Sequence, residues 1–416
     1  MVYVINQYNE PLMPTEDHRM VRLLLKNKKA KVVRRTPFTI KLLYATKKCV
    51  QPVVLGVDAG SKTVGLSAST ETKELFTAEL KPRNDVVNNL STRREFRQAR
   101  RNRKTRYRAP RFDNRVHSKH KGWLAPSVEV KIQEHITAIK RICKILPIAK
   151  AIVETAEFDL QLIKAVEAGL PVPVGEDYQK GEQRGFYNVR QYVFYRDSYK
   201  CCNCGAHGNG IKLEVHHLES RKTGGNAPDN LVTLCSHCHE LVTNGIILSF
   251  KKRKRNSTRD AAFMGIMRKT LIERLNKELT TPVFETKGYI TKYVREAYKL
   301  PKSHTIDALC ITEHPNVQRL NKIYLIKPVR NHNRQLHKAT ILKGGVRKSN
   351  QAATYVKGFR LFDKVLYNNQ ECFIWGRRTS GSMLLRLLDG TKIKDCVGYK
   401  NLKLLERSSN YLIFLK

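Results

Sequence analysis

The densest group of metal-binding side chains is two cysteine pairs, Cys201-x-x-Cys204 and Cys235-x-x-Cys238, with residues 205–234 between them. Two such pairs supply the four thiolates of a closed tetrahedral zinc site. The gap is longer than in the commonest zinc ribbons, so we expect a further structural element between the pairs. A unit this small is expected to need its metal in order to fold. The sequence therefore predicts a structural Zn²⁺ site.

Three histidines and an asparagine lie between and beside these pairs, in the order His216, His217, Asn230 and His239. A divalent cation can stabilise the scissile phosphate of a nucleic acid, and a neutral imidazole can activate the attacking water. This order resembles the HNH, or ββα-metal, endonuclease motif. The resemblance implies that His217 is the general base and that Asn230 orients the loop carrying it. It also implies that His216 and His239 hold one divalent ion.

Three acidic residues close or follow apolar segments that are far apart in the chain. Asp58 closes the run VVLGVD, Glu154 closes the run AKAIVE, and Asp307 follows His304 by three residues, which places the two on one helix face. Two-metal hydrolysis of a phosphodiester needs carboxylates that hold cations about 3.5–4 Å apart. We expect the three carboxylates to form such a divalent-metal site, with His304 as a ligand or base.

Each of these acids could instead be a solvated strand end or helix charge, and Glu157 and Asp159 are close rivals of Glu154. The Asp-Ala-Gly-Ser turn that begins at Asp58 resembles the first strand and turn of an RNase H-like fold. ATPases that share this fold use a similar first strand, so the turn by itself does not specify a nuclease.

Basic residues are unusually dense between positions 91 and 118. They are Arg93, Arg94, Arg97, Arg100, Arg101, Arg103, Lys104, Arg106, Arg108, Arg111 and Arg115. Because they occupy all faces of a helix, this is not an ordinary amphipathic surface helix. Guanidinium groups favour bidentate contact with phosphate. We expect a helix, ended by Pro110, that binds nucleic-acid backbones; the alternative is a disordered basic tail.

The whole chain is also strongly basic. Its 416 residues include 78 Lys and Arg against 36 Asp and Glu, a formal net charge of +42. Such a charge predicts a polyanionic partner, and nucleic acid first, because phosphate contacts release counterions. No apolar run is long enough to span a bilayer, and the N-terminal residues lack the features of a secretory signal. We therefore expect a cytoplasmic protein.

Hydrophobic spacing predicts the elements that must position these residues. For the N-terminal 50 residues we expect a strand, a short basic helix and two more strands. The expected carriers of the carboxylates are a strand ending at Asp58, a helix over 128–146, a strand over 149–154, a helix over 261–278, a strand over 283–290 and a helix capped by Ser303. From about residue 320, short alternating strands with turns predict a small SH3-like β-barrel.

The order of these segments resembles the IscB family, transposon-encoded relatives of the CRISPR effector nucleases that combine RuvC and HNH sites. A first carboxylate segment is followed by the arginine-rich helix, a second carboxylate segment, an inserted HNH motif and a third carboxylate segment. Near the N-terminus, Pro11-Leu12-Met13-Pro14 resembles the PLMP motif that names the first domain of that family. The resemblance covers nearly the whole chain and is weakest after residue 320.

The resemblance implies an α/β multidomain protein with a split RNase H-like (RuvC) core. The expected domains are a PLMP-like N-terminal domain (1–50), RuvC piece I (51–90), an Arg-rich bridge helix (91–118), RuvC piece II with a linker (119–185), a zinc-bound HNH domain (186–247), RuvC piece III (248–320) and a C-terminal β-rich domain (321–416) that contacts RNA and flanking DNA.

The resemblance also implies partners and cofactors. A structured guide RNA pairs with one strand of a double-stranded DNA target beside a short flanking motif. The HNH site cuts the guide-paired strand, the RuvC site cuts the displaced strand, and both sites use Mg²⁺ or Mn²⁺. We expect a monomeric protein within a ribonucleoprotein, in a prokaryotic cytoplasm and on the nucleoid when bound to its target.

Three other functions are compatible with parts of this pattern. An HNH homing or restriction-type endonuclease guided by protein contacts alone would explain the cysteines and histidines, but not the arginine-rich helix or the split carboxylates. A non-catalytic RNA-binding transposon protein would need none of the acids and histidines that are present. A Holliday-junction resolvase could use the RNase H-like core, but it would not need the HNH insertion.

Overall fold

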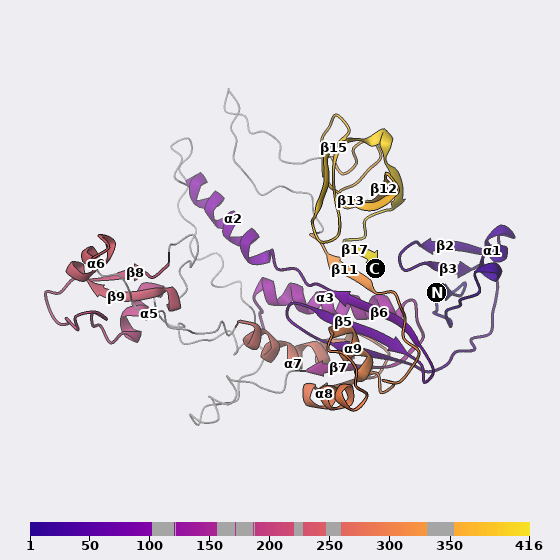
Figure 1. The fold of residues 1–416 in the computed structure, drawn as a ribbon, viewed down its shortest axis with the longest axis horizontal. Coiled ribbons are helices and arrows are strands. Elements are labelled where there is room, and N and C mark those ends of the chain that lie inside the picture. Colours follow the sequence, from indigo (N-terminus) through magenta and orange to yellow (C-terminus); the bar gives the residue numbers. More distant parts are fainter. Residues whose placement is uncertain are drawn as a thin grey trace. The chain divides into compact units, whose positions relative to one another are not determined.

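The computed structural model describes residues 1–101, 120, 122–155, 171, 186, 188–219, 228–246, 259–330 and 353–416. The chain divides into two units. One consists of Met1–Ile163 with Phe263–Lys416, and the other is Lys164–Ala262, inserted between the two halves of the first. Each unit has its own sheets and buried core (Figure 1).

A seven-stranded sheet forms the centre of the first unit, in the order β10-β7-β4-β5-β6-β11-β17. The strands β4, β5 and β6 form an antiparallel meander, while β7 and β10 extend the sheet on the other side of β4 and run parallel to it. Burial on both faces explains the apolar run in β4. The bounds are β4 (Val53–Asp58), β5 (Val64–Ser69), β6 (Glu74–Leu80), β7 (Ile148–Thr155), β10 (Val283–Lys287), β11 (Tyr324–Pro328) and β17 (Tyr411–Leu415).

Five helices accompany this sheet: α2 (Val86–Arg101), α3 (Pro126–Cys143), α7 (Arg259–Glu278), α8 (Gly288–Ala297) and α9 (His304–Ile311). The helix α3 buries an apolar stripe that includes Ile132, Ile136 and Ile139, as its spacing predicts. Packing of α9 is mainly against β4 and β5. The predicted helix at Ser303 is confirmed, because the Ser303 hydroxyl accepts a hydrogen bond from the Ile306 amide and caps α9.

One predicted strand is shorter than expected. The strand predicted over 283–290 ends at Lys287, and residues Gly288–Ala297 form the helix α8 instead. Tyrosine and β-branched residues dominate the first half of α8, so local propensity favoured a strand there. The buried position of Thr291, which is 4% exposed, indicates that tertiary packing stabilises the helix.

The N-terminal elements follow the predicted order of strand, helix, strand and strand. They are β1 (Tyr3–Ile5), α1 (His18–Lys26), β2 (Ala30–Arg34) and β3 (Thr39–Leu42), in a sheet ordered β1-β3-β2. Val4, Val21 and Ile40 lie in a small core that these elements share.

The C-terminal residues form an antiparallel five-stranded sheet with its own core, which includes Val365, Ile374 and Leu385. Its order is β15-β14-β13-β12-β16, and η4 (Tyr399–Asn401) precedes the last strand. The bounds are β12 (Lys364–Tyr367), β13 (Gln370–Arg377), β14 (Ser382–Arg386), β15 (Lys392–Gly398) and β16 (Lys403–Glu406). Two further strands of this region, β11 and β17, pair with each other in the central sheet of the unit.

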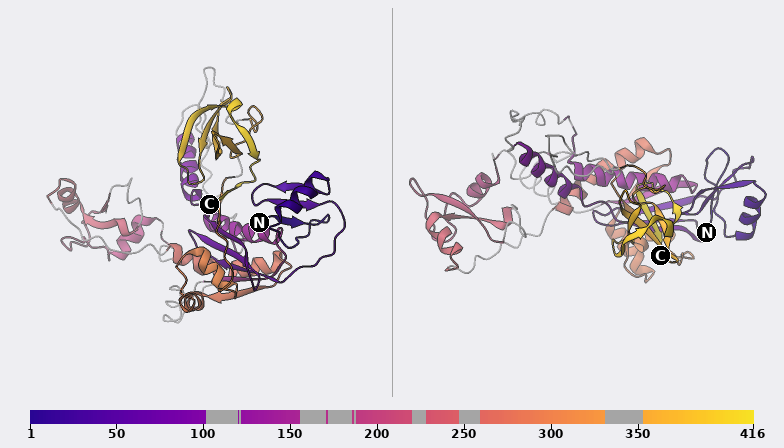
Figure 2. Two further views of the ribbon diagram at one scale, coloured as in Figure 1. Left: turned by 45° about the vertical axis from the view of Figure 1, so that its right-hand side comes forward. Right: turned by 90° about the horizontal axis from the view of Figure 1, so that it is seen from above.

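The inserted unit is a hairpin flanked by helices (Figure 2). The strands β8 (Leu213–His217) and β9 (Leu231–Cys235) are antiparallel, and η3 (Pro228–Asn230) leads into β9. Helix α5 (Val189–Arg196) precedes the hairpin and α6 (Ser236–Thr243) follows it directly. Among all the helices described, none is long and apolar enough to cross a membrane.

Candidate metal centres and nuclease site

The carboxylates of the first and second predicted segments are neighbours in the central sheet. Because β4 and β7 pair in parallel, Asp58 stands directly opposite Glu154 at the ends of the two strands. The helix α9 adds the third segment, and its first residue places His304 Nδ1 2.6 Å from Asp58 Oδ2. Three segments that are distant in the sequence therefore meet at the carboxyl ends of β4 and β7, as predicted.

Two glycines allow α9 to lie this close to the sheet. A Cβ atom at Gly65 would stand 1.8 Å from the backbone oxygen of His304, and one at Gly56 would stand 2.1 Å from that of Ala308. Any side chain at these positions would displace the helix. The close approach therefore depends on glycine, and it fixes where His304 and Asp307 enter the site.

The carboxylates lie in a largely buried and mutually repulsive environment. Burial raises the pKa of Glu154, and the charges of Asp58 and Asp307 raise it further. Burial and the charge of Asp58 likewise raise the pKa of Asp307. For His304, the hydrogen bond to Asp58 is the main cause of a raised pKa. Such a cluster gains stability from a nearby cation.

The donor set of this cluster fits a divalent cation. Glu154 Oε2 is buried and has no hydrogen-bond partner among the described residues, so one acceptor is available to a cation. Carboxylate oxygens are the ligands that Mg²⁺ prefers. Among the described residues, a group of three or more candidate ligand atoms within 4.8 Å of one another occurs only at four cysteines. The carboxylates of Asp58, Glu154 and Asp307 are neighbours, but their oxygens do not all lie within that distance of one another.

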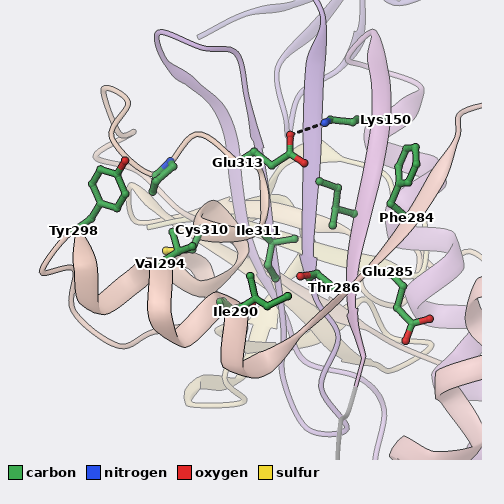
Figure 3. Close-up of a pocket in the computed structure, with 13 residues that line it drawn as sticks. Lys150, Phe284, Glu285, Thr286, Ile290, Val294, Tyr298, Cys310, Ile311 and Glu313 are labelled. Carbon is green, nitrogen blue, oxygen red and sulfur yellow. Dashed lines mark hydrogen bonds and ion pairs between the residues drawn. The ribbon is translucent and has the colours of Figure 1, made fainter.

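A cavity of about 600 Å³ lies near this cluster, between α8, α9 and the β10 edge of the sheet. Its lining is mostly apolar, and the ion pair between Lys150 and Glu313 stands on one side of it (Figure 3). None of the four predicted site residues, Asp58, Glu154, His304 and Asp307, lines this cavity. The cavity therefore adjoins the predicted nuclease site through Thr291 without including the predicted ligands.

In the inserted unit, the four predicted zinc ligands meet. The Sγ atoms of Cys201, Cys204, Cys235 and Cys238 all lie within 4.8 Å of one another. Asn203 Nδ2 donates to Cys238 Sγ at 3.3 Å, and the Cys238 amide donates to Cys235 Sγ.

The chemistry of this cysteine group suits a bound metal. Burial raises the pKa of Cys201, but the backbone amides of Cys204, Cys235 and Asn203 outweigh it and lower that pKa to about 6. Hydrogen bonds with the neighbouring thiols raise the pKa values of Cys204 and Cys238, so without metal the group favours one thiolate shared among four cysteines. A thiolate is the form that binds zinc, so the group is consistent with a structural Zn²⁺.

The hairpin brings the predicted HNH histidines together beside the cysteines. His216 on β8 and His239 on α6 have ring centroids 5.2 Å apart. Burial, together with the charges of His239 and His217, lowers the pKa of His216, which favours the neutral imidazole that metals bind. His217, the predicted base, is the last residue of β8.

Asn230 holds the chain just after the predicted base. Its Oδ1 accepts from the Glu219 amide at 2.7 Å, and its Nδ2 donates to the Glu219 oxygen at 3.1 Å. The Leu218 amide donates to the Asn230 backbone oxygen. This buried clamp fixes the backbone that leaves His217.

Sequence reasoning missed Glu214 as a member of this group. Glu214 lies on β8, the strand that also carries His216. Its Oε2 lies 3.2 Å from His239 Nδ1 on α6. The available signal was strand periodicity, because residues two apart in a strand point to the same face. Glu214 and His216 therefore share a face of β8, the face toward His239.

The structure covers only part of the predicted basic helix. Arg93 and Arg94 are exposed on α2, which begins earlier than expected, at Val86. Arg97, Arg100 and Arg101 lie in the same helix. The remaining predicted nucleic-acid ligands, Arg103, Lys104, Arg106 and Arg108, lie outside the described residues.

Two protein-family models match parts of the chain. Residues 2–181 match the family described as RRXRR protein, and residues 201–245 match the family described as HNH endonuclease. The chain therefore contains an HNH endonuclease domain, which implies hydrolysis of phosphodiester bonds by that domain. No curated protein matches the chain.

Solved structures give distant similarity to Cas9 proteins. Streptococcus thermophilus Cas9 in complex with AGGA PAM is 12% identical, with a TM-score of 0.29 over 46% of this chain and 26% of that one. The Type II-C Cas9 enzyme from Actinomyces naeslundii is 16% identical, with a TM-score of 0.16 over 48% of this chain and 30% of that one. The chain thus spans less than a third of the length of either protein.

Proposed function

We propose that this chain is an RNA-guided DNA endonuclease of the IscB type, in which two separate sites cut the two strands of a target. The observation that carries the proposal is the second site. An HNH domain accounts for one nuclease, yet the first unit independently gathers Asp58, Glu154 and His304 at one edge of its sheet. Two different sites in one chain can cut both strands without a second subunit.

The first unit supports the role of a RuvC-like nuclease. A meander extended by two strands parallel to its first strand supports the RNase H-like assignment. Asp58, Glu154 and Asp307 would hold the divalent cations, which supply charge stabilisation of the scissile phosphate. His304 Nδ1 is engaged by Asp58, which leaves Nε2 as the ring nitrogen able to take a proton from water.

In the HNH domain, we assign His217 as the general base that takes a proton from water. His216 and His239 would hold a single divalent ion, and Glu214 would orient His239 through its Nδ1. Asn230 positions the backbone that carries His217 through its clamp on Glu219. The four cysteines, with zinc bound, would hold the hairpin and α6 in this arrangement.

RNA guidance is supported by charge. A net charge of +42 exceeds what a short protein-read DNA site requires, and a structured RNA would neutralise much of it. The exposed arginines of α2 are suited to phosphate contact. The guide RNA would select the DNA target by base pairing, beside a short flanking motif.

The direct test is to purify the protein expressed with its native locus, sequence any RNA that co-purifies, and assay cleavage of a matched DNA library with randomised flanks. We expect one structured RNA and Mg²⁺-dependent cleavage of both strands. Cleavage of a fixed sequence that persists after RNase treatment would instead identify a protein-guided HNH endonuclease.

A further inference from the structure

The helix α8 turns one face toward two of the proposed metal ligands. Gly288, Thr291 and Arg295 are three and four residues apart, so they lie along the same side of the helix. The helix packs against α9, which carries Asp307. Thr291 is buried, and the side chain of Arg295 is only 13% exposed. This face therefore belongs to the interior of the site.

At one end of this face, Gly288 and Thr291 adjoin Glu154. A Cβ atom at Gly288 would lie 3.1 Å from Glu154 Oε1, which is tighter than an ordinary contact. Thr291 lies close enough to the same carboxylate to influence its protonation. The start of α8 therefore limits where the Glu154 side chain can lie.

At the other end of this face, Arg295 pairs with Asp307. Arg295 Nε lies 2.9 Å from Asp307 Oδ1, and the Asp307 side chain is 18% exposed. Neither atom has a hydrogen-bond partner among the described residues, so the contact is an ion pair without hydrogen-bond alignment. Solvent screens a pair this buried less than it screens an exposed pair, so the guanidinium charge attracts the carboxylate across this contact.

We propose that Arg295 is a positioning residue of the carboxylate site: it holds Oδ1 of Asp307 and leaves the other carboxylate oxygen for the divalent cation. The inference rests on the proposed function, because it takes Asp307 to be a metal ligand. Partners that orient metal ligands typically change metal affinity or activity about 10- to 100-fold when they are replaced. Arg295 would therefore set the metal concentration at which this site works.

The test compares Arg295→Met, which removes the charge, with Arg295→Lys, which keeps a charge but loses the planar guanidinium. A matched control is Arg274→Met, because Arg274 makes a two-point ion pair with Glu129 that includes no proposed ligand. Cleavage of each DNA strand is measured across a Mg²⁺ titration, and the melting temperature is recorded for every variant.

For Arg295→Met we expect the half-saturating Mg²⁺ concentration for the displaced strand to rise about tenfold. Cleavage of the guide-paired strand should keep its Mg²⁺ dependence. Arg295→Lys should show a smaller rise, and Arg274→Met none. An unchanged or lowered half-saturating concentration in a folded Arg295→Lys or Arg295→Met protein would overturn the proposal.

A second readout does not depend on cleavage. Mn²⁺ binding is measured by electron paramagnetic resonance in the full chain with His239→Ala, which removes a proposed ligand of the other site. Adding Arg295→Met should weaken the remaining Mn²⁺ binding by about the same factor. Equal or tighter binding would contradict the proposal. If displaced-strand cleavage in the parent protein proves independent of Asp58, the proposed function itself fails, and Arg295 is not at issue.

Discussion

His304 Nδ1 lies 2.6 Å from Asp58 Oδ2, although 246 positions separate the two residues in the chain. Asp58 ends β4 in the first half of the first unit, and His304 begins α9 in its second half. The inserted unit, Lys164–Ala262, lies between those halves in sequence. The two sides of this site can therefore meet only after the inserted unit has been synthesised.

Single substitutions should separate the two nuclease activities. We expect Asp58→Ala to slow cleavage of the displaced strand by on the order of a hundredfold or more, because metal stabilisation of the scissile phosphate is worth several kcal/mol. His217→Ala should slow cleavage of the guide-paired strand in the same way. Strand-specific end labels distinguish the two products. Loss of both cuts from either single change, with DNA binding retained, would show that the sites are not independent.

Zinc removal should affect one unit only. Cys201→Ser takes away one of four clustered thiolates, so we expect loss of bound zinc and of structure in the HNH unit, with displaced-strand nicking retained. The matched control is Cys202→Ser, because Cys202 is the exposed neighbour outside the cluster. Zinc content by mass spectrometry checks the prediction. Full zinc occupancy in Cys201→Ser would mean that the ligands are assigned incorrectly.

Glu214 should matter for the HNH metal, although its sequence context did not single it out. Glu214→Gln weakens the contact of 3.2 Å to His239 Nδ1, so we expect guide-paired strand cleavage to need about tenfold more Mg²⁺. Lys212 also pairs with Glu214, and Lys212→Met therefore serves as the control for loss of that ion pair. Equal effects of the two changes would assign Glu214 to the surface ion pair rather than to the histidine.

Stability of the first unit should fall between about pH 4.5 and pH 7 because of Glu134. Burial is the main cause that raises the pKa of Glu134 from 4.5 to about 7, and its carboxylate accepts a hydrogen bond from the Arg83 amide. The folded state thus keeps this proton over a range in which the unfolded state has lost it. Rising pH therefore lowers stability across that window, by about 3 kcal/mol in all, and has no further effect above it.

Glu134→Gln checks this directly, because glutamine can still accept the Arg83 hydrogen bond without ionising. Urea unfolding at several pH values should show the variant gaining stability relative to the parent as pH rises through the window. A constant difference from pH 4.5 to pH 7 would mean that Glu134 ionises equally in both states.

The carboxylate site was predictable because strand ends carry a local signal. The apolar runs before Asp58 and Glu154 indicate buried strands, and parallel pairing then brings their ends together. Local sequence could not show that β17 returns to pair with β11 in the central sheet. Alternation predicts a strand but not its partner, which long-range packing selects.

The helix α8 shows why Arg295 was not found from the sequence. Tyr289 and Ile290 favour a strand, and the strand predicted over 283–290 left position 295 outside any expected element. Packing against α9 and the sheet stabilises a helix instead, and only helical spacing places Arg295 on the face that Gly288 and Thr291 share. Arg295 was therefore missed because the helix that carries it was not predicted.

Exchanging the guide shows whether RNA selects the DNA that is cut. The guide segment of the co-purified RNA is replaced by one complementary to a second DNA, with the rest of the RNA and the flanking motif unchanged. We expect Mg²⁺-dependent cleavage of both strands to move to the second DNA and to cease at the first. Continued cleavage of the first DNA, whatever guide is supplied, would contradict RNA guidance.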